Sequence, residues 1–271
     1  MTGPIFDTHA HYSARAFDAD RFALLDSLPG KGVEGVCEQA THSGDAPRVL
    51  ELAHRYPWVV AAIGIHPESL LPAADCGEDG PAPTVSVYGG DWAAEMQALM
   101  PYYDDPKVVA VGECGLDYHW PVPKDAQLAL FEAEIRLALE LDKPIIVHDR
   151  QAHADVYALL KKYRPKGIVH CYSGSAEDAV QLAAQGLYIG FGGACTFSGA
   201  KRAAKAIEAL PLDAIVLETD CPYMAPEPVR GTRCDSSLIR YVGAYIAQRK
   251  ALAPEEVFRT TAANACRVFG L

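Results

Sequence analysis

The stretch Ile5-Phe6-Asp7-Thr8-His9-Ala10-His11 predicts a first β-strand that ends in two histidines. His9 and His11 are separated by one residue, so on an extended strand both imidazoles project to the same side. Two neutral imidazoles at a strand end can hold one divalent cation. The alternative is that a His-x-His pair is accidental surface polarity, and the metal interpretation is strengthened by matching ligands at the ends of later strands.

Seven further apolar stretches predict strands, each followed by a helix or a loop. Eight such units favour a closed parallel (β/α)8 TIM barrel, formed as a single domain over residues 1–271. The near-continuous apolar runs fit strands that are buried on both faces. A doubly wound open sheet is the rival fold, and it is disfavoured because no Gly-x-Gly-x-x-Gly turn follows the first strand. The further strands are predicted at residues 35–39, 58–65, 108–113, 144–148, 167–170, 187–191 and 214–220.

Helical periodicity fills most of the intervals between these strands. Residues 72–90 are an exception, because they are rich in Pro, Gly and Asp and predict an irregular surface insertion. Ser175-Ala176-Glu177-Asp178 fits a capping box that opens a helix. Helices are predicted over residues 18–28, 46–56, 123–141, 175–186, 236–249 and 254–269. One further helix is predicted to begin at Asp91, and another to contain Val156.

The composition is that of a soluble globular enzyme. Half of the 271 residues are hydrophobic and 22% are charged, and 24 Lys and Arg face 35 Asp and Glu, which gives a formal charge of −11. Such a surface repels nucleic acid at long range, so a nucleic-acid substrate needs local positive charge at the site. Eight cysteines without a CxxC pair suggest free thiols in a reducing compartment. The sequence shows no signal peptide and no apolar run of membrane-spanning length. We therefore expect a cytoplasmic protein that does not bind a membrane and needs no obligate protein partner.

Six metal-binding side chains fall at the C-terminal ends of predicted strands, where barrels of this kind carry their active sites. Four imidazoles and two carboxylates can hold two divalent cations, with one carboxylate as a bridge. A single histidine at the end of an apolar strand is as often a hydrogen-bonded core residue, so the prediction rests on the joint pattern. We assign His9, His11 and Asp220 to one metal, His148 and His170 to the other, and Glu113 to the bridge.

Several stretches in order along the chain then suggest a family. They are Asp7-Thr8-His9-Ala10-His11, Gly64-Ile65-His66-Pro67, Gly112-Glu113-Cys114-Gly115-Leu116-Asp117-Tyr118, His148-Asp149-Arg150, His170-Cys171-Tyr172-Ser173-Gly174, Glu218-Thr219-Asp220-Cys221-Pro222-Tyr223 and Asn264-Ala265-Cys266-Arg267-Val268-Phe269. Together they resemble the TatD family of metal-dependent deoxyribonucleases, within the amidohydrolase-like barrels. The resemblance covers almost the whole chain and implies a two-metal phosphodiesterase that acts on DNA.

The chain departs from the family pattern in two places. The stretch at 72–90 is longer than the family usually carries. After Arg230-Gly231-Thr232-Arg233, relatives typically continue Asn-Glu-Pro, whereas this chain has Cys234-Asp235-Ser236. Both departures bear on the substrate range more than on the metal chemistry.

The expected mechanism uses Asp220 and Glu113 as catalytic residues. Two divalent ions, drawn from Zn, Mn, Mg, Fe or Ni, activate a water, and Asp220 both ligates and accepts the water's proton. Glu218 either holds a ligand histidine or caps a layer of the barrel. Predicted substrate contacts are phosphate contacts by Arg150 and Arg233, base stacking by Tyr172, and a phosphate contact or a structural hydrogen bond by His66.

The acidic surface favours single-stranded DNA or DNA ends over long duplexes as the substrate. The main alternative is a binuclear amidohydrolase that cleaves a small amide, lactone or ester. Many such barrels bridge their metals with a modified lysine, whereas this fourth strand carries Glu113 and no lysine. A second alternative is a non-catalytic barrel with a structural metal, although structural sites are usually closed to water.

Overall fold

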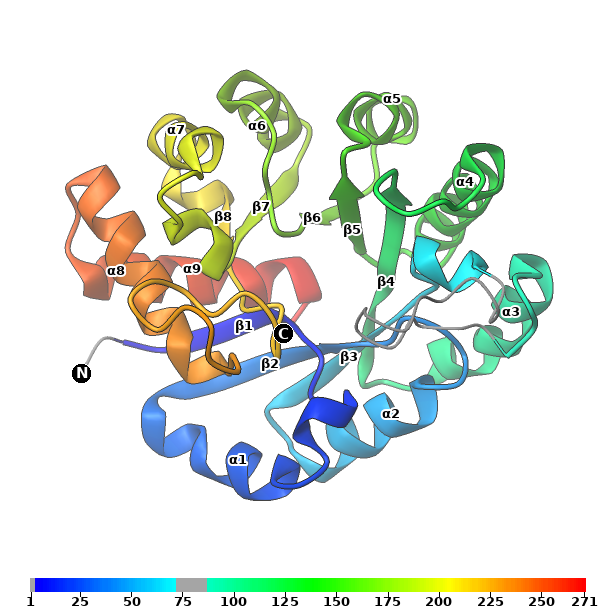
Figure 1. Cartoon of the computed structure of the whole chain (residues 1–271), viewed down its shortest axis with the longest axis horizontal. Coiled ribbons are helices and arrows are strands. Elements are labelled where there is room, and N and C mark those ends of the chain that lie inside the picture. The colour runs from blue at the N-terminus through cyan, green and yellow to red at the C-terminus, as the bar shows by residue number, and fades with distance from the viewer. Residues whose placement is uncertain (1–2, 72–86) are drawn as a thin grey trace. The chain divides into compact units, whose positions relative to one another are not determined.

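The protein is described by a computed structural model over residues 3–71 and 87–271. Eight strands, β1 to β8, alternate with helices along the chain (Figure 1), which is the order of elements in a (β/α)8 barrel. The chain divides into two compact units, residues 1–38 with 168–271 and residues 39–167. A single domain therefore stays a prediction. None of the described helices is long and apolar enough to cross a membrane.

The first unit contains the N-terminal strands and the last third of the chain. β1 pairs in parallel with β2, and β7 pairs in parallel with β8. The end of β1 also pairs with the segment that follows β8, through a bridge between Ala10 and Cys221. The elements are β1 (Ile5–Ala10), α1 (Arg21–Ser27), β2 (Val33–Gln39), β6 (Gly167–Val169), α6 (Ala176–Ala184), β7 (Leu187–Phe191), α7 (Lys201–Ala209), β8 (Ile215–Leu217), α8 (Ile239–Lys250) and α9 (Pro254–Phe269). The last residue of β2 and the first residue of β6 belong to the second unit.

The second unit is built on three parallel strands in chain order, β3, β4 and β5. Every residue of β3 is buried, as expected for a parallel strand covered on both faces. The inner side of α4 contributes Leu130, Phe131 and Ile135 to the core. The elements are α2 (Ala46–Arg55), β3 (Val59–Ile63), α3 (Trp92–Leu99), β4 (Val108–Asp117), α4 (Lys124–Glu140), β5 (Ile145–Arg150) and α5 (His153–Tyr163).

Each predicted strand is present, with ends that shift by a few residues. β4 continues to Asp117, four residues beyond its predicted end, and β8 stops at Leu217, three residues earlier than predicted. The predicted cap of α6 is confirmed, since the Asp178 N–H donates to Ser175 Oγ at 3.0 Å. Of the predicted insertion at 72–90, residues 72–86 lie outside the described residues, and the rest form a turn.

Helix α7 was missed by the sequence analysis. Its buried face consists of Ala203, Ala204, Ala206 and Ile207, three of which are alanines. Alanine is the strongest helix former but adds little to an apolar stripe, so a search for bulky residues at helical spacing passes over it.

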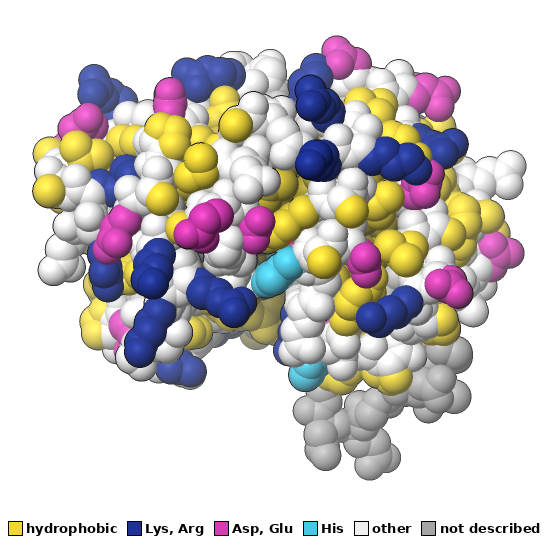
Figure 2. All heavy atoms as spheres, turned by 90° about the horizontal axis from the view of Figure 1, so that it is seen from above, with side chains coloured by type: hydrophobic (Ala, Val, Ile, Leu, Met, Phe, Trp, Pro, Cys, Tyr) yellow, Lys and Arg dark blue, Asp and Glu magenta, His cyan; other side chains and the backbone are white. Residues whose placement is uncertain are grey.

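Charged side chains of both signs share the surface. On the face shown in Figure 2, Lys and Arg side chains lie among Asp and Glu side chains. The excess of acidic residues therefore coexists with local positive charge on this face.

A buried carboxyl group on α4 supports the segment after β3. Glu134 is 1% exposed, and its Oε1 accepts the N–H of Ile65 at 2.8 Å. Ile65 directly precedes His66, so this hydrogen bond holds the backbone that presents that histidine. Burial raises the pKa of Glu134 well above its ordinary value, while the Ile65 N–H opposes the shift.

Because its pKa is raised by folding, Glu134 favours the folded state most where it is protonated. Its contribution is full below the unfolded pKa of about 4.3 and is lost as the pH rises through the folded value. The Glu134→Gln variant keeps an acceptor for Ile65 and has no proton to lose. We measure the free energy of unfolding of both proteins in urea at pH 5 and pH 9. We expect the variant to be more stable relative to the wild type at pH 9 than at pH 5.

A Glu134→Ala control leaves the Ile65 N–H unsatisfied and should lose about 1–3 kcal/mol at both pH values. A constant difference between wild type and Glu134→Gln from pH 5 to pH 9 would contradict the raised pKa.

Candidate metal centre

The two histidines of β1 converge as their spacing predicts. His9 lies within the strand and is fully buried, and His11 follows its last residue. Their Nε2 atoms lie 3.1 Å apart. With metal–nitrogen bonds of ~2.0–2.1 Å, this separation subtends an angle of about 100° at a shared cation. One divalent ion can therefore contact both rings without rearrangement.

Asp220 completes a three-ligand set that we name the β1/β8 triad (His9, His11 and Asp220). Asp220 Oδ1 lies 3.3 Å from His11 Nε2 and 3.7 Å from His9 Nε2. At the same bond length these spacings subtend roughly 105–130°, within the range of a distorted tetrahedral site. The three donor atoms all lie within 4.8 Å of one another, so the triad fits one cation.

Backbone hydrogen bonds fix the position of Asp220 against β1. The Asp220 N–H donates to the His9 carbonyl at 2.9 Å, and the His11 N–H donates to the Cys221 carbonyl at 2.9 Å. Asp220 adopts a positive φ of 61°, an uncommon conformation for a residue other than glycine. Burial raises its pKa, but the hydrogen bond from His11 and the charges of His9, His11 and His170 outweigh burial and lower it. The carboxylate is therefore ionised and ready to ligate.

A second carboxylate, Asp7, supports the triad from behind. It is fully buried, and its Oδ1 accepts the N–H of His9 at 3.2 Å and the N–H of Thr219 at 3.0 Å. Its Oδ2 accepts the hydroxyls of Thr219 and Ser236, both at 2.6 Å. Burial raises the pKa of Asp7 to about 6 against these four hydrogen bonds. Asp7 thus accepts hydrogen bonds both from the backbone of His9 and from Thr219, the residue directly before Asp220.

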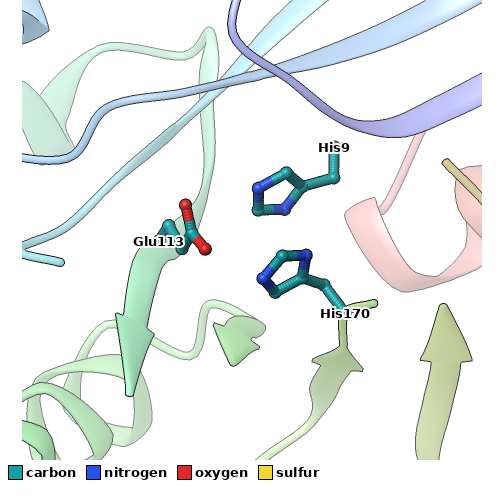
Figure 3. Close-up of side chains that lie close together, drawn as sticks. All are labelled: His9, Glu113 and His170. Atoms are coloured by element: carbon teal, nitrogen blue, oxygen red, sulfur yellow. The ribbon is translucent and has the colours of Figure 1, made fainter. Parts of the chain in front are cut away.

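His170 follows β6 and lies against the triad within the first unit. Its ring stacks on that of His9 at a centroid distance of 3.9 Å and an interplanar angle of 7° (Figure 3). Behind it, Glu218 Oε1 lies 3.8 Å from His170 Nδ1 and accepts the Cys171 N–H. Burial raises the pKa of Glu218 to about 8, with His170 opposing. Of the two roles considered for Glu218, support of His170 is the one this contact fits.

Glu113 and His148, which we name the β4/β5 pair, meet in the second unit. His148 Nδ1 lies 3.0 Å from Glu113 Oε1. Glu113 is 4% exposed and its N–H donates to the Ala40 carbonyl at 3.0 Å. A Cβ at Gly64 would lie 2.6 Å from the Gly112 Cα, so only glycine lets these strands approach so closely beside Glu113.

Asp117 orients the His148 ring and was not singled out by the sequence analysis. His148 Nε2 lies 3.0 Å from Asp117 Oδ2. Burial opposes a charge on His148, but the hydrogen bonds to Asp117 and Glu113 outweigh it and raise the pKa to about 10. A carboxylate that holds one imidazole nitrogen leaves the other for a cation, as is usual for metal-binding histidines. The signal in the sequence was the i, i+4 spacing of Glu113 and Asp117 on one strand face.

His66 is held in one tautomer by the backbone. Its Nδ1 accepts the N–H of Glu68 at 3.2 Å, so the proton of the neutral ring resides on Nε2. That Nε2 lies 3.8 Å from Glu113 Oε1. His66, Glu113 and His148 do place donor atoms within 4.8 Å of one another. An Nε2–H group, however, donates hydrogen bonds and cannot ligate a metal, so His66 is suited to an oxygen acceptor.

The predicted substrate contacts differ in accessibility. The Arg150 side chain is 47% exposed, with Nη1 4.0 Å from Asp117 Oδ2. The Arg233 guanidinium is bound by both Asp20 oxygens, at 2.8 and 2.6 Å. Tyr172 is 4% exposed and its hydroxyl donates to the Ser175 carbonyl at 2.6 Å. Base stacking by Tyr172 stays a prediction that this packing disfavours, and a phosphate at Arg233 has to displace Asp20.

Comparisons with known proteins place the chain in a family. The family described as TatD related DNase matches residues 6–270. The chain is 37% identical over 269 residues to the uncharacterized metal-dependent hydrolase YabD of Bacillus subtilis, covering 98% of each chain. It is 28% identical over 275 residues to the 3'-5' ssDNA/RNA exonuclease TatD of Cronobacter sakazakii, covering 98% of this chain and 97% of that one.

A solved structure extends this likeness to three dimensions. The TatD homolog YjjV from Escherichia coli K12 matches with a TM-score of 0.87 and 28% identity over 100% of both chains. This whole-chain match confirms the predicted (β/α)8 TIM-barrel fold, and the sequence matches confirm the resemblance drawn from the motifs. The chain belongs to the TatD family of metal-dependent hydrolases.

Proposed function

We propose that this protein is a metal-dependent phosphodiester hydrolase that acts on DNA ends or single strands. The observation that carries the proposal is the β1/β8 triad, whose donor atoms lie within 4.8 Å of one another with spacings that suit one divalent cation. The name of the relative from Cronobacter sakazakii, an exonuclease on single-stranded DNA and RNA, supports the choice of substrate class.

We further propose a second cation, held by His148 and His170 and bridged to the first by Glu113. In a (β/α)8 barrel the C-terminal ends of all strands open on one face, and all six predicted ligands lie in the C-terminal half of a strand or within three residues after it. The contacts of the β4/β5 pair support this assignment, because His148 Nδ1 and Glu113 Oε1 are already 3.0 Å apart. Mixed imidazole and carboxylate ligands suit Zn, Mn, Fe, Ni or Mg.

The ions supply Lewis-acid stabilisation of the phosphoryl oxygens and make the attacking water more acidic. Asp220 is the proton acceptor in this proposal, because its lowered pKa keeps the carboxylate ionised at neutral pH. His66 donates a hydrogen bond from Nε2–H to a phosphate oxygen, which the tautomer imposed by the Glu68 N–H allows. Arg150, half exposed at the end of β5, adds a charge-assisted contact to the phosphate.

The proposed function is tested by removing and restoring metal during a substrate comparison. We expect the protein to hydrolyse a single-stranded oligonucleotide with free ends faster than a blunt duplex. It should be inactive on a lactone and dipeptide panel, lose activity with a chelator and regain it with Mn²⁺ or Zn²⁺. Product release is followed by denaturing gel electrophoresis, and metal content by elemental analysis.

Asp220→Asn should lower turnover by about 10²–10⁴-fold at equal metal loading, because the proton acceptor is lost. Asp142→Asn is the matched control, because Asp142 is an exposed carboxylate that is paired with Lys166. Turnover of the lactone or dipeptide without DNA hydrolysis would instead establish the amidohydrolase alternative.

The bridging role of Glu113 predicts how metal binding responds to single substitutions. The wild type should bind two ions per chain, and His11→Ala should retain one. Glu113→Gln should weaken both, because the bridge contacts each ion. Zinc titration against a chromophoric chelator measures the two steps. A wild type that binds one ion, or a Glu113→Gln variant that keeps both wild-type affinities, would show that Glu113 is not the bridge.

The tautomer of His66 separates a substrate contact from a metal ligand. His66→Phe removes the Nε2 donor, so we expect KM to rise about tenfold to a hundredfold, as for a lost hydrogen bond to a charged group. The metal content should stay unchanged. His66→Gln, which keeps an N–H at a similar reach, should recover part of the KM. Loss of one metal ion in His66→Phe would identify His66 as a ligand and refute the donor role.

A further inference from the structure

Ser236 links the segments that carry all three triad residues. Its hydroxyl donates to Asp7 Oδ2 at 2.6 Å, and its N–H donates to the Tyr12 hydroxyl oxygen at 2.8 Å. The Tyr12 hydroxyl also lies 2.7 Å from Ser236 Oγ. Since the serine proton is given to Asp7, the Tyr12 O–H donates to Ser236 Oγ. Ser236 and Tyr12 are both fully buried, so these hydrogen bonds are shielded from water.

The network reaches His9 directly and the other two triad residues through an immediate neighbour. Asp7 accepts the backbone N–H of His9 at 3.2 Å. The same carboxylate accepts the N–H of Thr219 at 3.0 Å, and Thr219 directly precedes Asp220. Tyr12 directly follows His11, so a fixed Tyr12 fixes the backbone that aims the His11 ring.

Tyr12 is held by hydrogen bonds at its backbone N–H and at its hydroxyl, so its position is fixed at both ends. Its N–H donates to Glu38 Oε2 at 2.9 Å, and its ring packs on Phe17 at a centroid distance of 4.9 Å. In the described part of the chain, the hydroxyl at the far end of the ring is hydrogen-bonded to the Oγ and the N–H of Ser236. Loss of Ser236 Oγ therefore removes the acceptor of the Tyr12 O–H and its link to Asp7, and leaves only the Ser236 N–H bonded to that hydroxyl.

We propose that Ser236 is a positioning residue that sets the spacing of the β1/β8 triad through Asp7 and Tyr12, and so sets its affinity for a divalent cation. This inference rests on the proposed metal site and extends it to the residues that hold the ligands. Partners that orient metal ligands typically change metal affinity or activity by 10–100-fold when they are removed.

The test measures zinc affinity in the full-length protein by competition with a chromophoric chelator. The binding step that His11→Ala abolishes is assigned to the triad. Ser236→Ala should weaken this step by about 10–100-fold. Ser236→Thr, which keeps both the hydroxyl and the N–H, should restore most of the affinity.

Ser237→Ala is the matched control, because it removes a buried hydroxyl one residue away. The Ser237 N–H donates to Asp235 Oδ1 at 2.8 Å, a hydrogen bond that involves neither Asp7 nor Tyr12. Its zinc affinity should equal that of the wild type. Equal losses in Ser237→Ala and Ser236→Ala would indicate general loosening and overturn the inference.

Tyr12→Phe provides an independent route if Ser236→Ala fails to fold. It keeps the ring packing and removes the hydroxyl, so it should weaken the same step, and its loss should not add to that of Ser236→Ala. Wild-type affinity in folded Ser236→Ala or Tyr12→Phe, with only the free energy of unfolding lowered, would overturn the positioning role. Because no nucleic acid is present, a protein that binds zinc without cleaving DNA would refute the proposed substrate and leave this inference intact.

Discussion

The fully buried carboxylate of Asp7 is the constraint on which the geometry of the β1/β8 triad in the candidate metal centre depends. A carboxylate out of water is costly unless hydrogen-bond donors surround it. Here the donors come from β1, from the segment after β8 and from Ser236. These segments can satisfy Asp7 only when they lie side by side, and in that arrangement His9 and Asp220 face one another. The hydrogen bonds that satisfy the buried Asp7 therefore also fix how His9 and Asp220 are placed relative to one another.

The other two ligand histidines also have a carboxylate behind them, but the two carboxylates differ in charge. Burial opposes ionisation of Asp117, yet the hydrogen bond from His148 and the His119 N–H lower its pKa. Glu218 is buried with fewer donors, and its pKa rises to about 8. Asp117 is thus ionised at neutral pH and makes His148 more basic, whereas Glu218 largely keeps its proton. The two histidines proposed for the second ion are therefore backed by carboxyl groups of different charge.

The acidic composition and a polyanionic substrate are compatible because they act over different distances. Surface charges are screened beyond a Debye length of about 8 Å at physiological ionic strength, so the net charge of −11 mainly weakens long-range attraction. In the proposed site, two divalent ions would outweigh the carboxylates of Glu113 and Asp220, and the half-exposed Arg150 would add to their charge. A strand end can enter this local field without laying many phosphates along an acidic surface, which is why the proposed substrate is an end or a single strand.

The sequence predicted what depends on local pattern and missed what depends on contacts between distant residues. Alternation along β1 was enough to place His9 and His11 on one side, and the ends of apolar runs were enough to locate Glu113, His148 and His170. Nothing local marks Ser236 as a partner of Asp7, because 229 positions separate them and only the fold brings them together. The tautomer of His66 was equally hidden, since it is decided by the Glu68 N–H, a backbone donor that every residue except proline carries. A sequence can therefore name candidate cation-binding groups, while the groups that orient them are found only when buried donors and acceptors are paired in three dimensions.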